Sequence, residues 1–342
     1  MTKASIIFLS YQHEQFIAEA LVSALEQDHP DVEVIVADDG STDRTKEIIN
    51  EVVRSHPAGH RAKILPDAPN MGIVANWNRA VAAATGDVLV AMASDDIATP
   101  DRVSKVVCIF DSAPEVMAVF SQVSLIDAEG RIFMESFERH RPTYAKFVGL
   151  GGVAGIHFWQ GAPVLGACGC YRAVLARDFP PLVEALSEDQ PFVYRALLCG
   201  AVAYLPDRLV FWRWHGRNAS LGSMTDELCP DDALRRRAGL FFGRYLACSQ
   251  YARDAEAAFL EGSITRSRYE QEVAKIAGVR AIELLGGRTL QPETSCAAWV
   301  GAALDVLLRN VTSLAAWAYV ARSFIKYVAP VKFKLLKSRA IR

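Results

Sequence analysis

The chain has 342 residues, of which 51% are hydrophobic and 22% are charged, and its net charge at neutral pH is −2. This composition is that of a globular protein and excludes an intrinsically disordered chain. The near-neutral charge argues against nucleic acid as a partner of the whole protein. The seven cysteines are odd in number and include no CxxC pair, which argues against a disulfide framework and a cysteine zinc site.

The apolar segments are too short to act as a secretory signal or a membrane span. Residues 6–9 are shorter than a signal-peptide core, and Asp305 and Arg309 interrupt the apolar stretch near the C-terminal end. The longest uncharged run there, residues 310–321, falls short of the ~20 residues that a span needs. Together with the unpaired cysteines, these features predict a cytoplasmic protein.

The first half of the chain alternates apolar runs with amphipathic segments, which predicts a parallel sheet covered by helices. Strands are expected at residues 5–9, 32–37, 62–65, 87–91 and 116–126, and helices at residues 15–27, 42–55, 73–84 and 100–113. Residues 135–175 are rich in glycine and aromatic residues, which indicates a loop over a ligand site. A helix at 190–199 and a strand at 201–211 then precede helices at 230–254, 264–285, 297–308 and 314–328.

The C-terminal end of the chain is basic. Residues 322–342 carry seven Lys or Arg side chains and no acid, so all 39 acidic residues lie in the rest of the chain. Two interpretations stay open. Either packed helices end in a solvated charged tail, or the helices and the tail bring the protein to an anionic membrane surface as a peripheral protein.

Three polar clusters follow expected strands at the point where each strand ends. Ser10 and Tyr11 follow the first strand, Asp38 and Asp39 the second, and residues 94–96 (Ser-Asp-Asp) the fourth. Because ligands of open parallel sheets bind at the carboxyl ends of strands, we expect these clusters to converge on one crevice. No strand is followed by a G-x-G-x-x-G or Walker lysine motif, so dinucleotide and P-loop binding are not supported. Carboxylates in these places favour a hard divalent cation that carries phosphates.

Each carboxylate pair also has a simpler interpretation as a helix cap. Asp38 and Asp39 precede the helix expected from residue 42, and Asp95 and Asp96 precede the helix expected near Pro100. Acids at these places would complement the helix dipoles. Either pair alone is compatible with both roles, but their joint occurrence at two strand ends favours a site.

Two segments resemble one enzyme family. Residues 5–45 (SIIFLSYQHEQFIAEALVSALEQDHPDVEVIVADDGSTDRT) are similar to the N-terminal signature of glycosyltransferase family 2, and residues 70–103 (NMGIVANWNRAVAAATGDVLVAMASDDIATPDRV) are similar to its next block. The resemblance covers residues 4–220. It implies an α/β domain of the GT-A fold at residues 1–224, with a mixed and mainly parallel sheet, followed by a helical region at 225–342. Members of this family are inverting nucleotide-sugar transferases.

The resemblance implies a binding site for the donor nucleotide. Tyr11 would lie against the nucleotide base, and Asp39 would accept a hydrogen bond from it. The strand-end residues Ser10 and Asp38 and the N-x-G segment that begins at Asn70 would complete the site. A UDP-sugar is the favoured donor, and a hydroxyl of a glycan or of a lipid-linked sugar is the expected acceptor.

The metal site implied by the family departs from its usual D-x-D pattern. The first Asp of that pattern would stand at position 93, where this chain has Ala93. We therefore expect Asp96 to hold Mn²⁺ or Mg²⁺ and Asp95 to lie beside it near the ribose, although the choice between the two acids stays open. His215, within an R-x-H-x-x-N-x-S segment, is a further candidate ligand.

The pair Glu188 and Asp189 resembles the E-D motif of the family, in which the Asp is the catalytic base. The alternative is an acidic first turn of the helix that follows. His13 and the histidines at positions 56 and 60 are expected to be solvated, and Cys168 and Cys170 to be packing residues.

The proposed reaction is a single displacement with inversion, in which Asp189 deprotonates the acceptor while a metal ion assists departure of the diphosphate. Two other functions are weighed. A nucleotidyltransferase would carry a glycine-rich basic loop after the first strand, which residues 9–16 lack. A non-catalytic protein that binds nucleotide sugars would explain Ala93.

Overall fold

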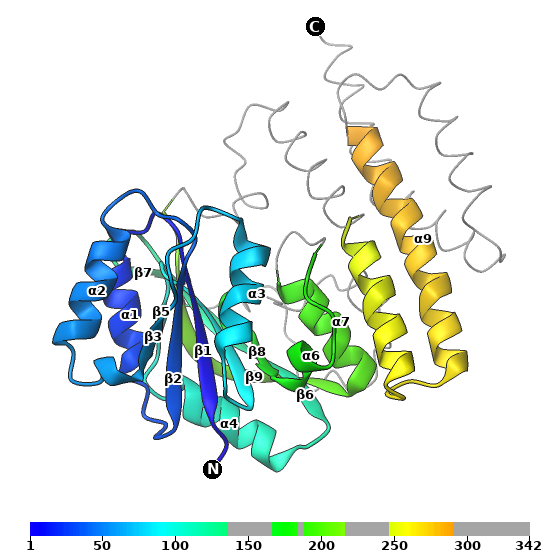
Figure 1. The fold of residues 1–342 in the computed structure, drawn as a ribbon, viewed down its shortest axis with the longest axis horizontal. Coiled ribbons are helices and arrows are strands. Elements are labelled where there is room, and N and C mark those ends of the chain that lie inside the picture. Colours follow the sequence, from blue (N-terminus) through cyan, green and yellow to red (C-terminus); the bar gives the residue numbers. More distant parts are fainter. Residues whose placement is uncertain (136–165, 184–187, 216–245, 291–342) are drawn as a thin grey trace, which may run out of the picture. The chain divides into compact units, whose positions relative to one another are not determined.

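The computed structural model describes residues 1–135, 166–183, 188–215 and 246–290, which Figure 1 draws as ribbons. The chain divides into two compact units. The first comprises residues 1–183, 187–216 and 257–264, and the second comprises residues 184–186, 217–256 and 265–342. The boundary expected at residues 224 and 225 lies outside the described residues, so that domain division stays a prediction.

The first unit holds the expected elements of an α/β domain. Its strands are β1 (Ala4–Ser10), β2 (Val32–Asp38), β3 (Ala62–Ile64), β4 (Val88–Ala93), β5 (Ile97–Ala98), β6 (Val116–Ile126), β7 (Ile132–Met134), β8 (Cys170–Arg172) and β9 (Ala201–Arg213). Its helices are α1 (Ile17–Leu25), α2 (Thr45–Ser55), α3 (Ile73–Ala83), α4 (Arg102–Ser112), α6 (Val174–Arg177) and α7 (Asp189–Cys199), with short 3-10 turns η1 (Gly59–Arg61) and η3 (Gly166–Cys168).

The strands form one mixed sheet in the order β3-β2-β1-β4-β8-β6-β9-β5. Outside this order, β7 pairs with the last residues of β6. The first four strands of this order are parallel to one another. β8 is antiparallel to both of its neighbours, β4 and β6, whereas β6 and β9 are parallel. The expected mixed, mainly parallel sheet with flanking helices is confirmed.

β1 lies between β2 and β4, so the strand order reverses at β1. The chain passes from β1 to β2 on one side and later returns to β4 on the other side. In open α/β sheets, the crevice beyond the carboxyl ends of the strands at such a reversal is where ligands bind. The topology therefore directs attention to the loops that follow β1, β2 and β4.

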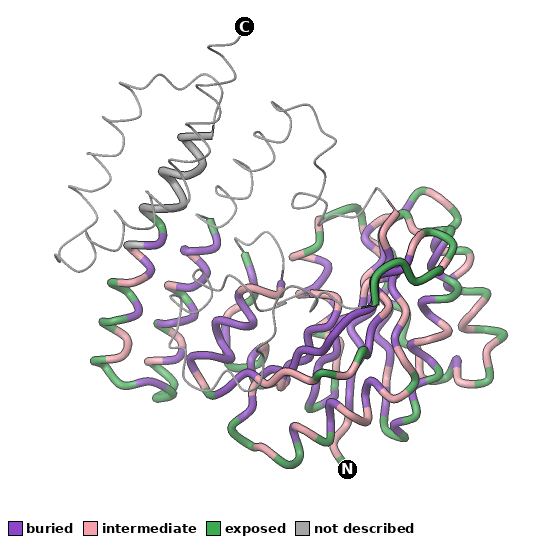
Figure 2. Tube along the Cα trace, turned by 180° about the vertical axis from the view of Figure 1, so that it is seen from behind, coloured by how far each residue is buried: buried purple, intermediate pink, exposed green. Residues whose placement is uncertain are grey.

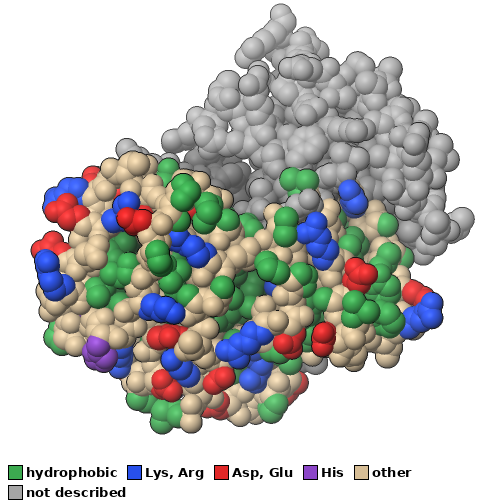
Figure 3. All heavy atoms as spheres, in the orientation of Figure 1, with side chains coloured by type: hydrophobic (Ala, Val, Ile, Leu, Met, Phe, Trp, Pro, Cys, Tyr) green, Lys and Arg blue, Asp and Glu red, His purple; other side chains and the backbone are tan. Residues whose placement is uncertain are grey.

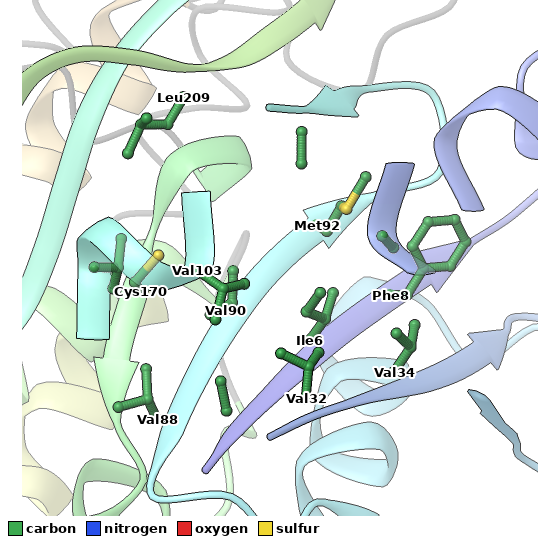
Figure 4. Close-up of a cluster of buried hydrophobic side chains, with 14 of the residues drawn as sticks. Ile6, Phe8, Val32, Val34, Val88, Val90, Met92, Val103, Cys170 and Leu209 are labelled. Carbon is green, nitrogen blue, oxygen red and sulfur yellow. The ribbon is translucent and has the colours of Figure 1, made fainter. Parts of the chain in front are cut away.

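Alternate residues of the central strands build the main apolar core. Figure 4 shows Ile6 and Phe8 of β1 beside Val34 of β2 and Val90 and Met92 of β4, all of them buried. Side chains of α1, α2 and α4 pack on the same face. Each fully buried side chain of this kind contributes about 1.5–3 kcal/mol relative to exposure. Figure 2 shows that the strands are mainly buried.

The opposite face of the sheet is also covered, because α3 packs on β1 and β2. Ile7 and Ile35 have the opposite parity along their strands and are fully buried. Burial on both faces explains why the strands of the parallel part are continuous apolar runs.

Helices also occur in the last described range. Residues 246–260 are helical, and α9 (Arg266–Leu290) follows, in agreement with the helices expected at 230–254 and 264–285 where these are described. The expected helices at 297–308 and 314–328, the basic residues 322–342 and most of the glycine-rich segment at 135–175 lie outside the described residues. No helix within the described ranges is long and apolar enough to cross a lipid bilayer.

The surface carries charges of both signs. Figure 3 shows Lys and Arg side chains interspersed with Asp and Glu side chains on the face in view. Exposed ion pairs such as Arg44 with Glu47 and Arg131 with Asp127 contribute little stability, because water screens them. The fold therefore depends on its apolar core.

Candidate active site

All three predicted strand-end clusters meet at the carboxyl end of β1. Ser10 stands opposite Asp38 in the ladder with β2, and Leu9 stands opposite Ala93 in the ladder with β4. The backbone amide of Ser94 donates to the carbonyl of Leu9 over 3.0 Å. The loops after β2 and β4 therefore flank the loop after β1, as the sequence predicts.

Asp38 organises the loop that follows β2. Its Oδ2 accepts hydrogen bonds from the hydroxyls of Ser10 (2.9 Å) and Ser41 (2.6 Å), and its Oδ1 accepts one from the backbone amide of Ser41 (2.8 Å). Since α2 begins only at Thr45, Asp38 does not cap that helix. The contacts give Asp38 and Ser10 a structural task, and their contact with a nucleotide stays a prediction.

Asp39 connects β2 to the N-x-G segment. This buried carboxylate accepts hydrogen bonds from the backbone amides of Met71 (2.8 Å, Oδ1) and Gly72 (2.9 Å, Oδ2). Each carboxylate oxygen has a second lone pair, so Asp39 can still accept a hydrogen bond from an N–H group of a nucleotide base. The side chains of Asn70 and Tyr11 are exposed near this connection and are accessible to a ligand.

Gly40 allows the N-x-G segment to lie close to β2. Its φ is +77°, and an added Cβ would stand 2.6 Å from the backbone nitrogen of Asn70 and 2.9 Å from the carbonyl carbon of Pro69. Only glycine avoids both the strain of a positive φ and this contact. The glycine of the DDGS motif therefore serves loop packing.

Asp95 lies beside two histidines. Oδ2 of Asp95 is 3.0 Å from Nε2 of His215 and 3.9 Å from Nε2 of His13. One ligand atom from each of the three side chains lies within 4.8 Å of the others, which is the spacing of a metal site. The predicted candidates Asp95 and His215 are thus together.

Asp96 faces a different environment. Its Oδ1 accepts a hydrogen bond from the backbone amide of Arg213 (2.9 Å), and the side chain is buried. Burial and, secondarily, the charge of Asp95 raise the pKa of Asp96 well above its ordinary value. Asp96 is not in the three-residue group, so this geometry favours Asp95 over the expected Asp96 as metal ligand.

Arg213 holds the turn that carries both acids. Its Nε donates to the carbonyl of Asp95 (2.9 Å), and its Nη1 donates to the carbonyls of Asp127 (3.2 Å) and Ala128 (3.0 Å). Nη2 donates to the carboxylate of Glu19 over 2.7 Å, and the guanidinium lies 5.0 Å from the ring centroid of Phe16. This buried arginine joins β9 to the loop after β4.

The expectation that His13 is solvated is wrong. Its side chain is 21% exposed, and Nδ1 lies 2.8 Å from the hydroxyl of Ser94. Burial lowers the pKa of His13, although the charge of Asp95 acts in the opposite direction. The signal that sequence reasoning overlooked is its place three residues after Ser10, in a loop already assigned to the site.

Glu188 and Asp189 stand at the start of α7. Oδ1 of Asp189 accepts a hydrogen bond from the backbone amide of Gln190 (2.7 Å), as expected of an acid in a first helical turn. Glu188 is buried, and its Oε2 has no hydrogen-bond partner among the described residues. Burial and, secondarily, the charge of Asp189 raise the pKa of Glu188 to about 7.

The 3-10 turn η3 connects Glu188 and Asp189 to strand β4 of the sheet. A Cβ on Gly166 would stand 2.9 Å from Oε1 of Glu188 and 3.8 Å from Oδ2 of Asp189. On its other side, η3 is joined to β4, because Nη2 of Arg102 donates to the carbonyls of Ala91 (2.8 Å) and Ala167 (3.0 Å). Asp189 therefore belongs to the part of the fold that flanks β4.

The sequence of this chain is similar to those of known glycosyltransferases. The profile of Glycosyl transferase family 2 matches residues 5–175. An uncharacterized glycosyltransferase of Nostoc sp. (strain PCC 7120) is 27% identical over 230 residues, which are 66% of this chain and 69% of that protein. An uncharacterized protein of Mycobacterium tuberculosis (strain ATCC 25618 / H37Rv) is 31% identical over 225 residues, which are 65% of this chain and 62% of that protein.

The fold is similar to that of a solved structure with a bound nucleotide sugar. The structure of residues 1–349 of S. aureus TarS, solved in complex with UDP-GlcNAc, superposes with a TM-score of 0.52 and 20% identity, and the match covers 89% of each chain. The sheet topology, the strand-end carboxylates and the matched profile lead to one conclusion. The chain belongs to glycosyl transferase family 2 and has the GT-A glycosyltransferase fold.

Proposed function

We propose that this glycosyltransferase transfers a sugar from a nucleoside diphosphate sugar to a hydroxyl group with inversion at the anomeric carbon. The observation that carries the proposal is the arrangement of three acidic groups along one sheet edge: Asp39 after β2, Asp95 with His215 after β4, and Asp189 beyond η3. Family membership removes the nucleotidyltransferase alternative.

We propose that the nucleotide of a UDP-sugar occupies the edge near Asp39. The exposed Tyr11 ring is available to stack on the base, and Asp39 retains acceptor capacity for a base N–H. The UDP-GlcNAc complex of TarS supports this choice of donor, since TarS shares the fold. The proposed acceptor is a hydroxyl of a glycan or of a lipid-linked sugar.

Asp95 and His215 would hold the divalent ion, Mn²⁺ or Mg²⁺. The donor set fits such an ion, because a carboxylate oxygen and an imidazole nitrogen face each other at 3.0 Å beside the end of β4. A bound divalent ion supplies positive charge that stabilises the departing diphosphate. Arg213 fixes the backbone of Asp95, so the carboxylate is positioned before any ligand arrives.

Asp189 is the proposed general base. The backbone amide of Gln190 fixes Oδ1, and Oδ2 faces Gly166, where an added Cβ would be in ordinary van der Waals contact at 3.8 Å. An acceptor hydroxyl at hydrogen-bond distance from this carboxylate would lose its proton to Asp189 as the glycosidic bond breaks.

Replacing the base tests the proposal. In Asp189→Asn, we expect metal-dependent turnover of the preferred UDP-sugar to fall by about 10²–10⁴-fold, while the dissociation constant for UDP with Mn²⁺ changes little. Turnover is measured as UDP release from a panel of UDP-, GDP- and dTDP-sugars. Asp67→Asn, at an exposed position, is the control. Unchanged UDP release by Asp189→Asn would contradict the assignment of Asp189 as general base. If the wild type does not bind UDP, the proposed use of a UDP-sugar is contradicted.

A second candidate function follows from Ala93. A protein that binds nucleotide sugars without turnover would tolerate the loss of one acid from the D-x-D pattern. Nucleotide binding by the wild type, together with no UDP release from any donor with or without added hydroxyl acceptors, would favour this second function.

We also propose a peripheral membrane contact through the basic residues 322–342. The proposal is supported by seven Lys or Arg side chains without an acid in that segment. Cosedimentation with anionic vesicles should then fall when the segment is deleted, and it should fall with rising salt. Equal cosedimentation of the full chain with neutral vesicles would contradict an electrostatic contact.

A further inference from the structure

We propose that His13 is a third protein ligand of the metal site, so that two imidazoles and the carboxylate of Asp95 hold the ion. The proposal rests on the proposed function, because the same ion would carry the diphosphate of the donor. It deepens that function by specifying the metal. A site with two nitrogen ligands prefers a transition-metal ion to Mg²⁺, which is bound mainly by oxygen.

The distances suit simultaneous ligation. Nitrogen and oxygen ligands about 2.0–2.2 Å from one ion are separated from each other by about 3–4 Å. Oδ2 of Asp95 is 3.0 Å from Nε2 of His215 and 3.9 Å from Nε2 of His13. The ligand atoms of all three side chains lie within 4.8 Å of one another. Small side-chain rotations would therefore bring them into contact with one ion.

The second nitrogen of His13 has the partner that a ligating histidine requires. Metal-bound histidines almost always donate their other ring N–H to an oxygen, which fixes the tautomer and the ring orientation. Nδ1 of His13 lies 2.8 Å from the hydroxyl oxygen of Ser94, which is buried at the end of β4. With the Nδ1–H donated to Ser94, the lone pair is on Nε2, the atom nearest to Asp95.

The backbone of His13 is fixed as well. Its amide donates to the hydroxyl of Thr45 (2.9 Å), and its carbonyl accepts from the amides of Phe16 and Ile17 (both 2.9 Å) at the start of α1. The Phe16 ring packs against His215, with centroids 4.8 Å apart. Both imidazoles are therefore held by rigid elements, as a preorganised metal site requires.

Ion selectivity distinguishes ligation by His13 from a purely structural hydrogen bond to Ser94. We expect the wild type to bind Co²⁺ at least about 100-fold more tightly than Mg²⁺, because imidazole suits Co²⁺ far better. His13→Ala should weaken Co²⁺ binding at least about 10-fold and should change Mg²⁺ binding little. A structural histidine would affect both ions equally or neither.

The experiment measures metal binding directly, with the full chain in the presence and absence of UDP. Co²⁺ is titrated by its visible absorption, Mn²⁺ by loss of the free-ion paramagnetic resonance signal, and Mg²⁺ by competition with Mn²⁺. His13→Asn is the second variant, because its amide can keep the bond to Ser94 while it lacks Nε2. His60→Ala, at an exposed position, is the control.

Each outcome has one meaning. A selective loss of Co²⁺ affinity in both His13→Ala and His13→Asn, with His60→Ala unchanged, supports the proposal. Unchanged Co²⁺ affinity and absorption in both His13 variants, together with loss in His215→Ala, overturns ligation by His13 and leaves the proposed function intact. Absence of any metal binding by the wild type, even with UDP, overturns the metal site of the proposed function itself.

Discussion

Glu188 illustrates how the fold changes the chemistry of a single side chain. Its pKa is raised from the ordinary 4.5 to about 7, first by burial and then by the neighbouring charge of Asp189. Between these two values the folded protein binds a proton that the unfolded chain releases. The free energy of unfolding therefore decreases as the pH rises through this window and levels off above it.

Replacing this carboxyl by an amide should remove that pH dependence. We expect Glu188→Gln to have a higher free energy of unfolding than the wild type at pH 8, by about 1–3 kcal/mol, and nearly the same value near pH 4.5. Urea unfolding at several pH values measures the difference. Glu51→Gln, at an exposed position, is the control. A difference that is constant from pH 4.5 to 8 would show that ionisation of Glu188 is not its cause.

At the residue scale, the sequence pointed to acids more readily than to their partners. Asp39 and Asp189 became candidates because motifs of fixed spacing contain them. The role proposed for His13 was missed because it depends on Ser94 and Asp95, which are more than 80 positions away and become its neighbours only through the pairing of β1 with β4. A motif records the order of residues, whereas a ligand set is defined in space.

At the scale of elements, the loop after β2 and the segment before α3 act as one piece. Asp39 binds the amides of Met71 and Gly72, and the absence of a side chain at Gly40 lets residues 68–70 approach the backbone. A nucleotide that contacts Asp39 would therefore depend on the positions of both the loop after β2 and the segment before α3. The packing at Gly40 is the weak point of this arrangement, because no other residue fits there.

Adding a methyl group at Gly40 tests the packing. Gly40→Ala should be destabilised by about 1–3 kcal/mol more than Gly262→Ala, because both glycines have a positive φ but only Gly40 faces a backbone contact. The φ values are +77° and +76°, and nothing lies within 4 Å of the position of an added Cβ at Gly262. Chemical unfolding and UDP binding are measured for both. Equal losses of stability in the two variants would show that the N-x-G segment can move away from an added Cβ at Gly40 with no further loss in the free energy of unfolding.

Long elements were predicted well, whereas of the strands with two or three residues only β3 was predicted. The strand expected at 116–126 matches β6, whose apolar run is long enough to identify it. β5 has two residues and β8 has three, and both exist because partner strands far along the chain bind their backbones. Local sequence has too few residues there to show a period. The segment around Cys168 and Cys170 was expected only to pack, and both cysteines are buried.

At the scale of the whole molecule, ligand binding should be visible as stabilisation. A ligand at 100 times its dissociation constant adds about 2.7 kcal/mol to the free energy of unfolding of the form that binds it. UDP with Mn²⁺ should therefore raise the midpoint of thermal unfolding more than UDP with a chelator. In Asp95→Asn, the metal-dependent part of the increase should disappear, because the carboxylate next to His215 is lost. Differential scanning fluorimetry measures both, and a metal effect that persists in this variant would place the ion elsewhere.

The order of strands is the property that the sequence did not reveal. Periodicity identified β6 and β9, but not that β8 would separate β6 from β4, nor that β9 would pair with β5 beside the proposed metal site. These arrangements are set by packing across the sheet, which no local pattern encodes. The general prediction of a mixed sheet came from the family resemblance.

The hydrogen bond from Arg213 to Asp96 and the contact of His215 with Asp95 join residues 117 and 120 positions apart. During synthesis on the ribosome, β1 to β4 emerge long before these partners exist. The nascent chain therefore lacks the Arg213 and His215 contacts of these carboxylates, and one edge of β6 stays unpaired, until β9 has been translated. Folding of the proposed site is thus completed late in biosynthesis, and fragments that stop before residue 213 should remain substrates for chaperones and proteases.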